Sequence, residues 1–163
     1  MESVRPVTPF AALHYRYIQK QLLKAKRPVR DPKKLIFLSP QSLIDLQWWA
    51  KESGFKSNCS ASLREPAPTL HIWSDASMEG AGAHSSKGEF IQREWTPKEL
   101  GLNPHINLLE LRSAREAVVA FAHPGDRVRL HVDSKVAAAY LRKQGGTRSD
   151  ALSQEACLLW DDC

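Results

Sequence analysis

The hydrophobic pattern is most strand-like over residues 70–75, where Leu70, Ile72 and Trp73 suit a pleated, buried surface. Small residues and glycines follow and permit a tight reversal, after which residues 81–84 and 90–95 are predicted as two further strands. These three segments predict an antiparallel meander. Residues 128–133 are β-rich and alternate between apolar and polar, which predicts a fourth strand.

Helical spacing of apolar residues predicts the helices that accompany these strands. One helix begins at Asn107, a good N-cap with Glu110 three residues on, as in a capping box, and runs to Phe121. Ser134 caps a second helix, and a third ends at Trp160. The order strand–strand–strand–helix–strand–helix–helix is typical of an α/β fold. It predicts a mixed sheet, made of the three-strand antiparallel meander plus a parallel strand and flanked by helices.

Two amphipathic helices are predicted before the strands. The first contains Tyr17 and carries several lysines. The second opens with Ser39 as its N-cap and Pro40 at its first helical position. Its predicted buried stripe is Leu43, Leu46, Trp49 and Ala50.

The charge of the chain is unevenly distributed. Residues 1–60 contain 11 Lys or Arg and 4 Asp or Glu, whereas residues 61–163 contain 12 and 14, for a net charge of +5. Residues 55–69 are rich in serine and proline and predict a linker. We therefore divide the chain into a basic helical arm, residues 1–60, and an α/β domain, residues 61–163. A basic arm suits a polyanionic partner such as nucleic acid; a solvated surface kept for solubility is the alternative.

Length and composition limit the class of protein further. The 163 residues, 42% of them hydrophobic, are enough for one domain with an appendage. No apolar run approaches the ~18 residues of a membrane span, and the N-terminus has no apolar signal core. Cys59, Cys157 and Cys163 are widely spaced, which favours free thiols in a reducing compartment. We expect an intracellular protein of the cytoplasm or nucleus, neither secreted nor bound to a membrane.

Three carboxylates stand at the ends of predicted elements. Asp75 ends the first strand, Asp133 ends the fourth, and Glu110 lies in the first turn of the helix after the meander. Singly, each has a structural explanation, because aspartate forms turns and Glu110 completes a capping box. If the first and fourth strands are adjacent and parallel, both aspartates emerge at one edge of the sheet, where the start of the helix brings Glu110.

Carboxylates that gather in this way repel one another and need cations. Ligand sets made only of oxygen favour Mg²⁺ or Mn²⁺. Two such ions about 4 Å apart activate a water molecule and stabilise the leaving oxygen in phosphodiester cleavage. The three acids therefore predict a magnesium or manganese site, with two ions if the protein is active.

With these residues in place, the chain resembles the ribonuclease H domain of reverse transcriptases, in the version carried by DIRS-type and related LTR-like retrotransposons. The resemblance covers roughly residues 35–160. Its motifs are Trp73-Ser74-Asp75-Ala76-Ser77 with Gly80 and Gly82-Ala83, His105-Ile106-Asn107 with Leu109-Glu110-Leu111, Val132-Asp133-Ser134, and Gln144-Gly145-Gly146-Thr147-Arg148-Ser149. Upstream, Leu38-Ser39 and Asp45-Leu46-Gln47-Trp48-Trp49 resemble the segment that joins polymerase to ribonuclease H.

The resemblance implies a ribonuclease H-like fold and endonucleolytic cleavage of the RNA strand of an RNA–DNA hybrid. It assigns Asp75, Glu110 and Asp133 as Mg²⁺ ligands. It also makes the backbone around Ala76-Ser77 a candidate for contacts with the 2′-OH groups that distinguish RNA. Thr147 and Arg148 are candidates for holding a phosphate, with an ordinary surface arginine as the alternative.

The chain departs from the family pattern at its C-terminal end. The family supplies a fourth acid on a last helix, after a fifth strand, and this sequence stops at Cys163 before either. We do not expect Asp161 or Asp162 to substitute. The expected domain therefore lacks the last strand and helix. The alternative to a nuclease is a catalytically impaired or domesticated module that binds nucleic acid or protein, with an open sheet edge that invites a partner chain or self-association.

Overall fold

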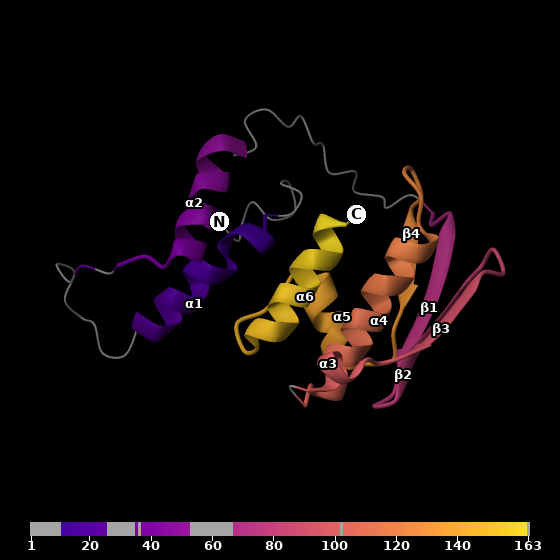
Figure 1. Ribbon diagram of the computed structural model, residues 1–163. Coiled ribbons are helices and arrows are strands. Elements are labelled where there is room, and N and C mark those ends of the chain that lie inside the picture. Colours follow the sequence, from indigo (N-terminus) through magenta and orange to yellow (C-terminus); the bar gives the residue numbers. More distant parts are fainter. Residues whose placement is uncertain (1–10, 26–34, 36, 53–66, 102, 163) are drawn as a thin grey trace.

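A computed structural model describes residues 11–25, 35, 37–52, 67–101 and 103–162 (Figure 1). The predicted boundary at residue 60 and most of the predicted linker lie outside the described residues. The N-terminal part contains a 3-10 turn, η2 (Leu13–Tyr15), followed by α1 (Arg16–Ala25) and α2 (Pro40–Glu52). The elements that follow are β1 (Leu70–Ala76), β2 (Gly80–Ser85), β3 (Phe90–Glu94), α3 (Pro97–Leu100), α4 (Ile106–Phe121), β4 (Val128–His131), α5 (Lys135–Arg142) and α6 (Asp150–Asp161).

The four strands form one mixed sheet in the order β3-β2-β1-β4. β1 pairs with β2, and β2 with β3, in antiparallel register, whereas β1 pairs with β4 in parallel. The parallel register places Leu70 opposite Val128 and Trp73 opposite His131. The predicted meander with an added parallel strand is confirmed, and so is the α/β class.

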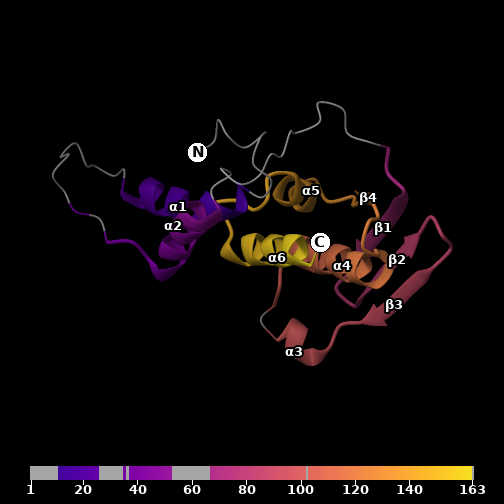
Figure 2. The same cartoon turned by 90° about the horizontal axis from the view of Figure 1, so that it is seen from above.

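The helices among the described residues cover one face of the sheet. Figures 1 and 2 show α4, α5 and α6 between the strands and the N-terminal helices. Along β1, Leu70, Ile72 and Ser74 are buried beneath this helical layer, whereas Trp73 and Asp75 are exposed on the opposite face. The main core cluster joins the sheet to α4 through Leu70, Ile72, Ala83, Ala117, Val118 and Phe121. Each large apolar side chain buried there contributes roughly 1.5–3 kcal/mol.

The N-terminal helices pack against one another through polar contacts. The Asp45 carboxylate accepts a hydrogen bond from the Tyr17 backbone N–H at 3.2 Å, and Trp49 Nε1 donates to the His14 carbonyl at 2.7 Å. This polar seam explains why the predicted stripe of α2 is partly wrong. Ser42 and Asp45 are the buried residues of the helix, while Leu43 and Ala50 are exposed. Ser39 does bond the N–H of Ser42, as expected for an N-cap.

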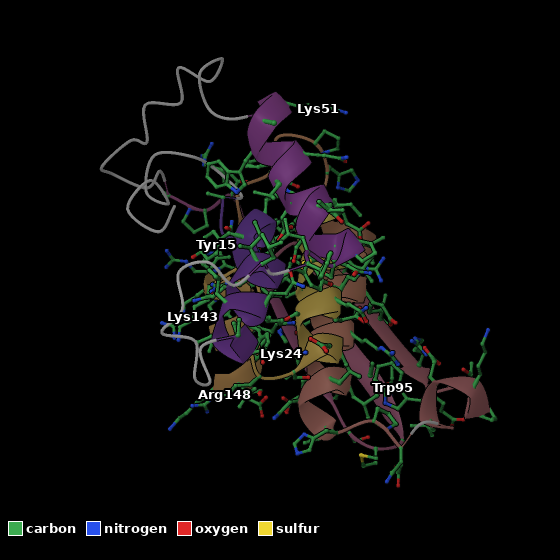
Figure 3. All side chains as sticks on the ribbon, turned by 90° about the vertical axis from the view of Figure 1, so that its left-hand side faces the viewer. Tyr15, Lys24, Lys51, Trp95, Lys143 and Arg148 are labelled. Carbon is green, nitrogen blue, oxygen red and sulfur yellow. The ribbon has the colours of Figure 1, made fainter. Side chains whose placement is uncertain are left out.

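The arm is tied to the domain by two charged side chains of α1. Lys20 forms an ion pair with Asp150 at the start of α6, and Arg16 donates to the Lys143 carbonyl at the end of α5. Both side chains are buried by these contacts. Figure 3 shows the same side of the molecule, where Tyr15, Lys24, Lys143 and Arg148 are labelled.

The start of α4 differs from the sequence prediction. His105, not Asn107, is the N-cap, because its Nδ1 accepts a hydrogen bond from the Asn107 N–H at 3.2 Å. The predicted capping box between Asn107 and Glu110 is therefore wrong. Asn107 lies inside the helix and its Oδ1 accepts a hydrogen bond from Ser134 Oγ at 3.2 Å.

Two other boundaries also shift. β4 ends at His131, so Asp133 lies two residues beyond the strand. After Trp95 the chain forms the short helix α3, which the sequence patterns above do not include and which has a complete capping box between Thr96 and Glu99. Arg93 on β3 pairs with Glu99 and with Glu116 on α4. Its hydrogen bond to Glu99, followed by those from Thr96, lowers the pKa of Glu99 to about 2.

Candidate functional site

The two aspartates reach the same end of the sheet. Asp75 lies near the C-terminal end of β1 and its Oδ1 accepts the Ala76 N–H at 2.8 Å. Trp73 pairs with His131 in the parallel register, and Asp75 and Asp133 each follow two residues later in the chain. Both aspartates line one groove of about 1090 Å³ on the face of the sheet that the helices leave open.

Helix α4 holds Glu110 beside this end of the sheet. Ser113, which is buried, donates from Oγ to the Asp75 carbonyl at 2.8 Å. Six residues earlier, Asn107 accepts a hydrogen bond from Ser134, the neighbour of Asp133. Residues 107, 110 and 113 are three apart and share one face of the helix. Glu110 therefore lies between an anchor to the first aspartate and an anchor next to the second.

Glu110 is unusual because its Oε2 is buried and has no hydrogen-bond partner. A buried carboxylate oxygen without a partner is costly, on the order of 1–3 kcal/mol. Such an atom fits the edge of a cation site, and an oxygen-only ligand set suits Mg²⁺ or Mn²⁺. Within the described ranges, however, no group of three or more His, Cys, Asp or Glu side chains is arranged to hold a metal ion.

Ala76 and Ser77 also line the groove, at the turn from β1 to β2. Ser77 closes this turn: its N–H donates to the Gly80 carbonyl at 2.9 Å, and its Oγ accepts the N–H of Gly80 at 3.1 Å. Gly80 is required here, since a Cβ would meet the Arg93 carbonyl oxygen at 2.3 Å. The backbone N–H groups of Ala76 and Ser77 are thus engaged within the chain.

Thr147 and Arg148 lie elsewhere, in the turn between α5 and α6. This turn is fixed by the Tyr140 hydroxyl, which accepts the Ser149 N–H at 3.0 Å, and by Gly145 with a φ of 95°. Figure 3 places Arg148 with Lys143 and Lys24, on the arm side of the molecule. The structure therefore does not bring these two residues to the aspartates. Asp161 and Asp162 do not line the groove either, and Asp162 pairs with Arg115.

Sequence reasoning missed a row of stacked rings on the open face. His84 of β2, Trp73 of β1 and His131 of β4 stand side by side, and His71 of β1 extends the row. Burial, followed by the nearby His71 and Arg129, lowers the pKa of His131. The alternation of β1 signalled that His71 and Trp73 share a face, but their cross-strand neighbours depend on the register.

Comparison of the chain with protein-family models, with curated proteins and with solved structures gives no match. The fold itself defines the class: an α/β protein with a four-stranded mixed sheet, three strands antiparallel and one parallel, flanked by helices. None of the described helices has the length and apolarity that a membrane span requires.

Proposed function

We propose that this chain is a retroelement-derived ribonuclease H-like domain that cleaves the RNA strand of RNA–DNA hybrids by metal-assisted phosphodiester hydrolysis. The observation that carries the proposal is that Asp75 and Asp133 reach the same end of the sheet. They follow paired positions of parallel strands and line one groove, and Glu110, on α4, has a buried, unpartnered oxygen. The free thiol of Cys157 suits an intracellular setting for this activity.

The proposal gives each of these residues a separate role in hydrolysis. Asp75, Glu110 and Asp133 would hold Mg²⁺ or Mn²⁺, two ions if the domain is active. Bound ions of this kind supply a water nucleophile and neutralise charge on the reacting phosphate. Ser113 positions the helix that carries Glu110 against the Asp75 backbone. The groove at the open face gives a polymeric substrate access to Asp75 and Asp133; Glu110 does not line it.

The test is a gel assay of a labelled RNA–DNA hybrid with the full chain, in Mg²⁺ and separately in Mn²⁺. We expect cleavage of the RNA strand that falls at least about a hundredfold in Asp75→Asn and in Asp133→Asn. Glu89→Gln is the matched control, because this exposed acid lies in the β2–β3 turn and does not line the groove. Folded wild-type protein that leaves the hybrid intact in both metals would overturn the proposal.

A second candidate is a module on the same scaffold that binds nucleic acid or protein without cleaving it. It is favoured by the lack, over the described residues, of three ligands arranged for a metal ion. Exposed apolar side chains on the arm, such as Leu35, Phe37 and Ile44, also suit a binding surface. Hybrid binding without cleavage, measured by fluorescence anisotropy, would support this module. A mass above that of the monomer in light scattering would point to self-association, for which the edge strands β3 and β4 are available.

A further inference from the structure

The row of rings on the open face is a rigid device that the proposed nuclease chemistry does not use. Consecutive centroids are 5.0 Å apart from His84 to Trp73, 4.8 Å from Trp73 to His131 and 5.3 Å from His131 to His71. The ring planes differ by 7°, 10° and 18° along the row. The four rings, from three strands, therefore pack against one another, and the orientation of each ring is restricted by its neighbours.

At one end of the row, two imidazole nitrogens face each other. His71 Nδ1 and His131 Nε2 are 3.0 Å apart, so one of them donates a hydrogen bond and the other accepts it. His71 is held further by Trp73, whose ring centroid lies 5.8 Å away. These two imidazole nitrogens, held on adjacent strands, are placed to supply two ligands to one metal ion.

The separation of the two nitrogens selects among metal ions. With metal–imidazole bonds of about 2.1 Å, a nitrogen–nitrogen distance of 3.0 Å corresponds to an angle of about 90° at the ion. That angle joins neighbouring positions of a square-planar or tetragonal ion, the geometry of Cu²⁺ and Ni²⁺. A tetrahedral ion needs the nitrogens about 3.4 Å apart.

We propose that His71 and His131 form a binding site for a divalent transition-metal ion of the imidazole-preferring, tetragonal kind, Cu²⁺ or Ni²⁺. Metal binding replaces this hydrogen bond: the ring that donates it passes its proton, through solvent, to its own other nitrogen, so that both facing nitrogens present a lone pair and the net charge of the protein is unchanged. The two rings then turn together until both lone pairs point to the ion, and water fills the other positions. The site uses nitrogen ligands, whereas the carboxylate centre offers oxygen ligands that suit Mg²⁺. His131 lines the same groove as Asp75 and Asp133, but His71 does not.

The experiment is a titration of the full chain with Ni²⁺, followed by calorimetry and by tryptophan emission. Trp73 stacks on His131, so an ion held by the pair lies next to its indole and quenches its fluorescence. We expect one saturable event, with quenching that is lost in Trp73→Phe. Affinity should fall at least about tenfold in His71→Gln and in His131→Gln, which keep a hydrogen-bonding side chain but remove the imidazole.

His84→Gln is the matched control, because His84 stacks on the other side of the same tryptophan. We expect it to bind Ni²⁺ as the wild type does. Circular dichroism confirms that each variant is folded, and Ala replaces Gln in any variant that is not. The proposal is overturned if wild-type protein gives no saturable binding, if His84→Gln weakens binding as much as His71→Gln, or if only Asp75→Asn abolishes it.

Discussion

At the scale of single residues, Glu110 combines a cost to stability with a proposed role. Its buried Oε2 has no hydrogen-bond partner, which costs free energy in the folded state. Glu110→Gln should therefore raise the free energy of unfolding by about 1 kcal/mol, while hybrid cleavage is lost. Urea denaturation and the gel assay measure the two effects. A Gln variant that is less stable than the wild type would show that the carboxylate has a structural partner instead.

Asp45 gives the arm a dependence on pH. Burial raises its pKa to about 6, against two backbone hydrogen bonds that lower it. The folded state binds the Asp45 proton more tightly than the unfolded state does. The contribution of Asp45 to stability is therefore greatest below about pH 4 and falls as the pH rises to about 6. We expect Asp45→Asn to remove this contribution.

The difference in stability between Asp45→Asn and the wild type isolates the contribution of Asp45 from that of other titrating groups. Thermal unfolding of the arm, followed by tryptophan emission at pH 4.5 and pH 7.5, should show the variant gaining stability relative to wild type at the higher pH. Trp49 reports on this contact because it bonds the His14 carbonyl. An equal difference at both pH values would contradict the prediction.

Sequence patterns identified several residues correctly and failed where a partner came from a distant segment. Ser134 caps α5 as expected, because a serine N-cap needs only the N–H three residues on, here that of Ala137 at 3.1 Å. Asn107 seemed an equally good cap, but its side chain bonds Ser134, and His105 takes its place. The change of N-cap from Asn107 to His105 depends on the packing of α4 against the start of α5. Capping preferences describe neighbours in sequence and cannot predict such a contact.

At the scale of elements, the contact between α4 and β1 connects the helix to the candidate centre. Ser113→Ala removes the hydrogen bond to the Asp75 carbonyl and should cost about 1 kcal/mol. Because Glu110 lies one turn away on the same helix, we also expect hybrid cleavage to fall severalfold. Urea denaturation and the gel assay report the two losses.

The control for this variant is Ser153→Ala on α6. Ser153 is also buried and donates to the Gly146 carbonyl at 2.7 Å, in the turn away from the aspartates. It should lose similar stability and keep its cleavage rate. Equal losses of cleavage in both variants would mean that Ser113 acts through general stability rather than through the position of α4.

Among the elements, strands were predicted better than helix faces. The strands β1 to β3 follow from alternation and glycine-rich turns, which are local signals. The face of α2 was misjudged because its contacts with the segment before it are polar: Asp45 accepts the Tyr17 N–H of α1, and the Trp49 indole donates to the His14 carbonyl of η2. The paired aspartates were anticipated, but their end of the sheet depended on the parallel register of β1 and β4.

At the scale of the whole molecule, the α/β domain contains its own core. Over the described residues, three clusters of buried apolar residues are built from residues 67–162, and none of them includes a described residue of the arm. A chain of residues 61–163 should therefore unfold cooperatively, with a melting temperature a few degrees below that of the full chain. Circular dichroism on heating checks this. A fragment without a cooperative transition would show that the arm is part of the fold.

The same fragment tests the role of the arm in binding. Residues 1–60 carry most of the excess positive charge. Their removal should weaken hybrid binding and flatten its dependence on salt concentration, because fewer phosphates are neutralised. The two chains are compared by anisotropy titrations at about 50 to 200 mM salt, the range over which phosphate neutralisation strongly changes affinity. Unchanged salt dependence would show that the arm does not face the nucleic acid.

The parallel pairing of β1 with β4 also sets an order of assembly. The meander of β1, β2 and β3 needs only contacts between neighbours in sequence, whereas β4 joins β1 after α4 has crossed the sheet. Pairings between distant segments form late, because the loop that they close must be ordered first. A chain emerging from the ribosome therefore displays Asp75 well before Asp133 can reach it. Any hydrolytic activity would therefore begin only after β4 has been synthesised and has joined β1.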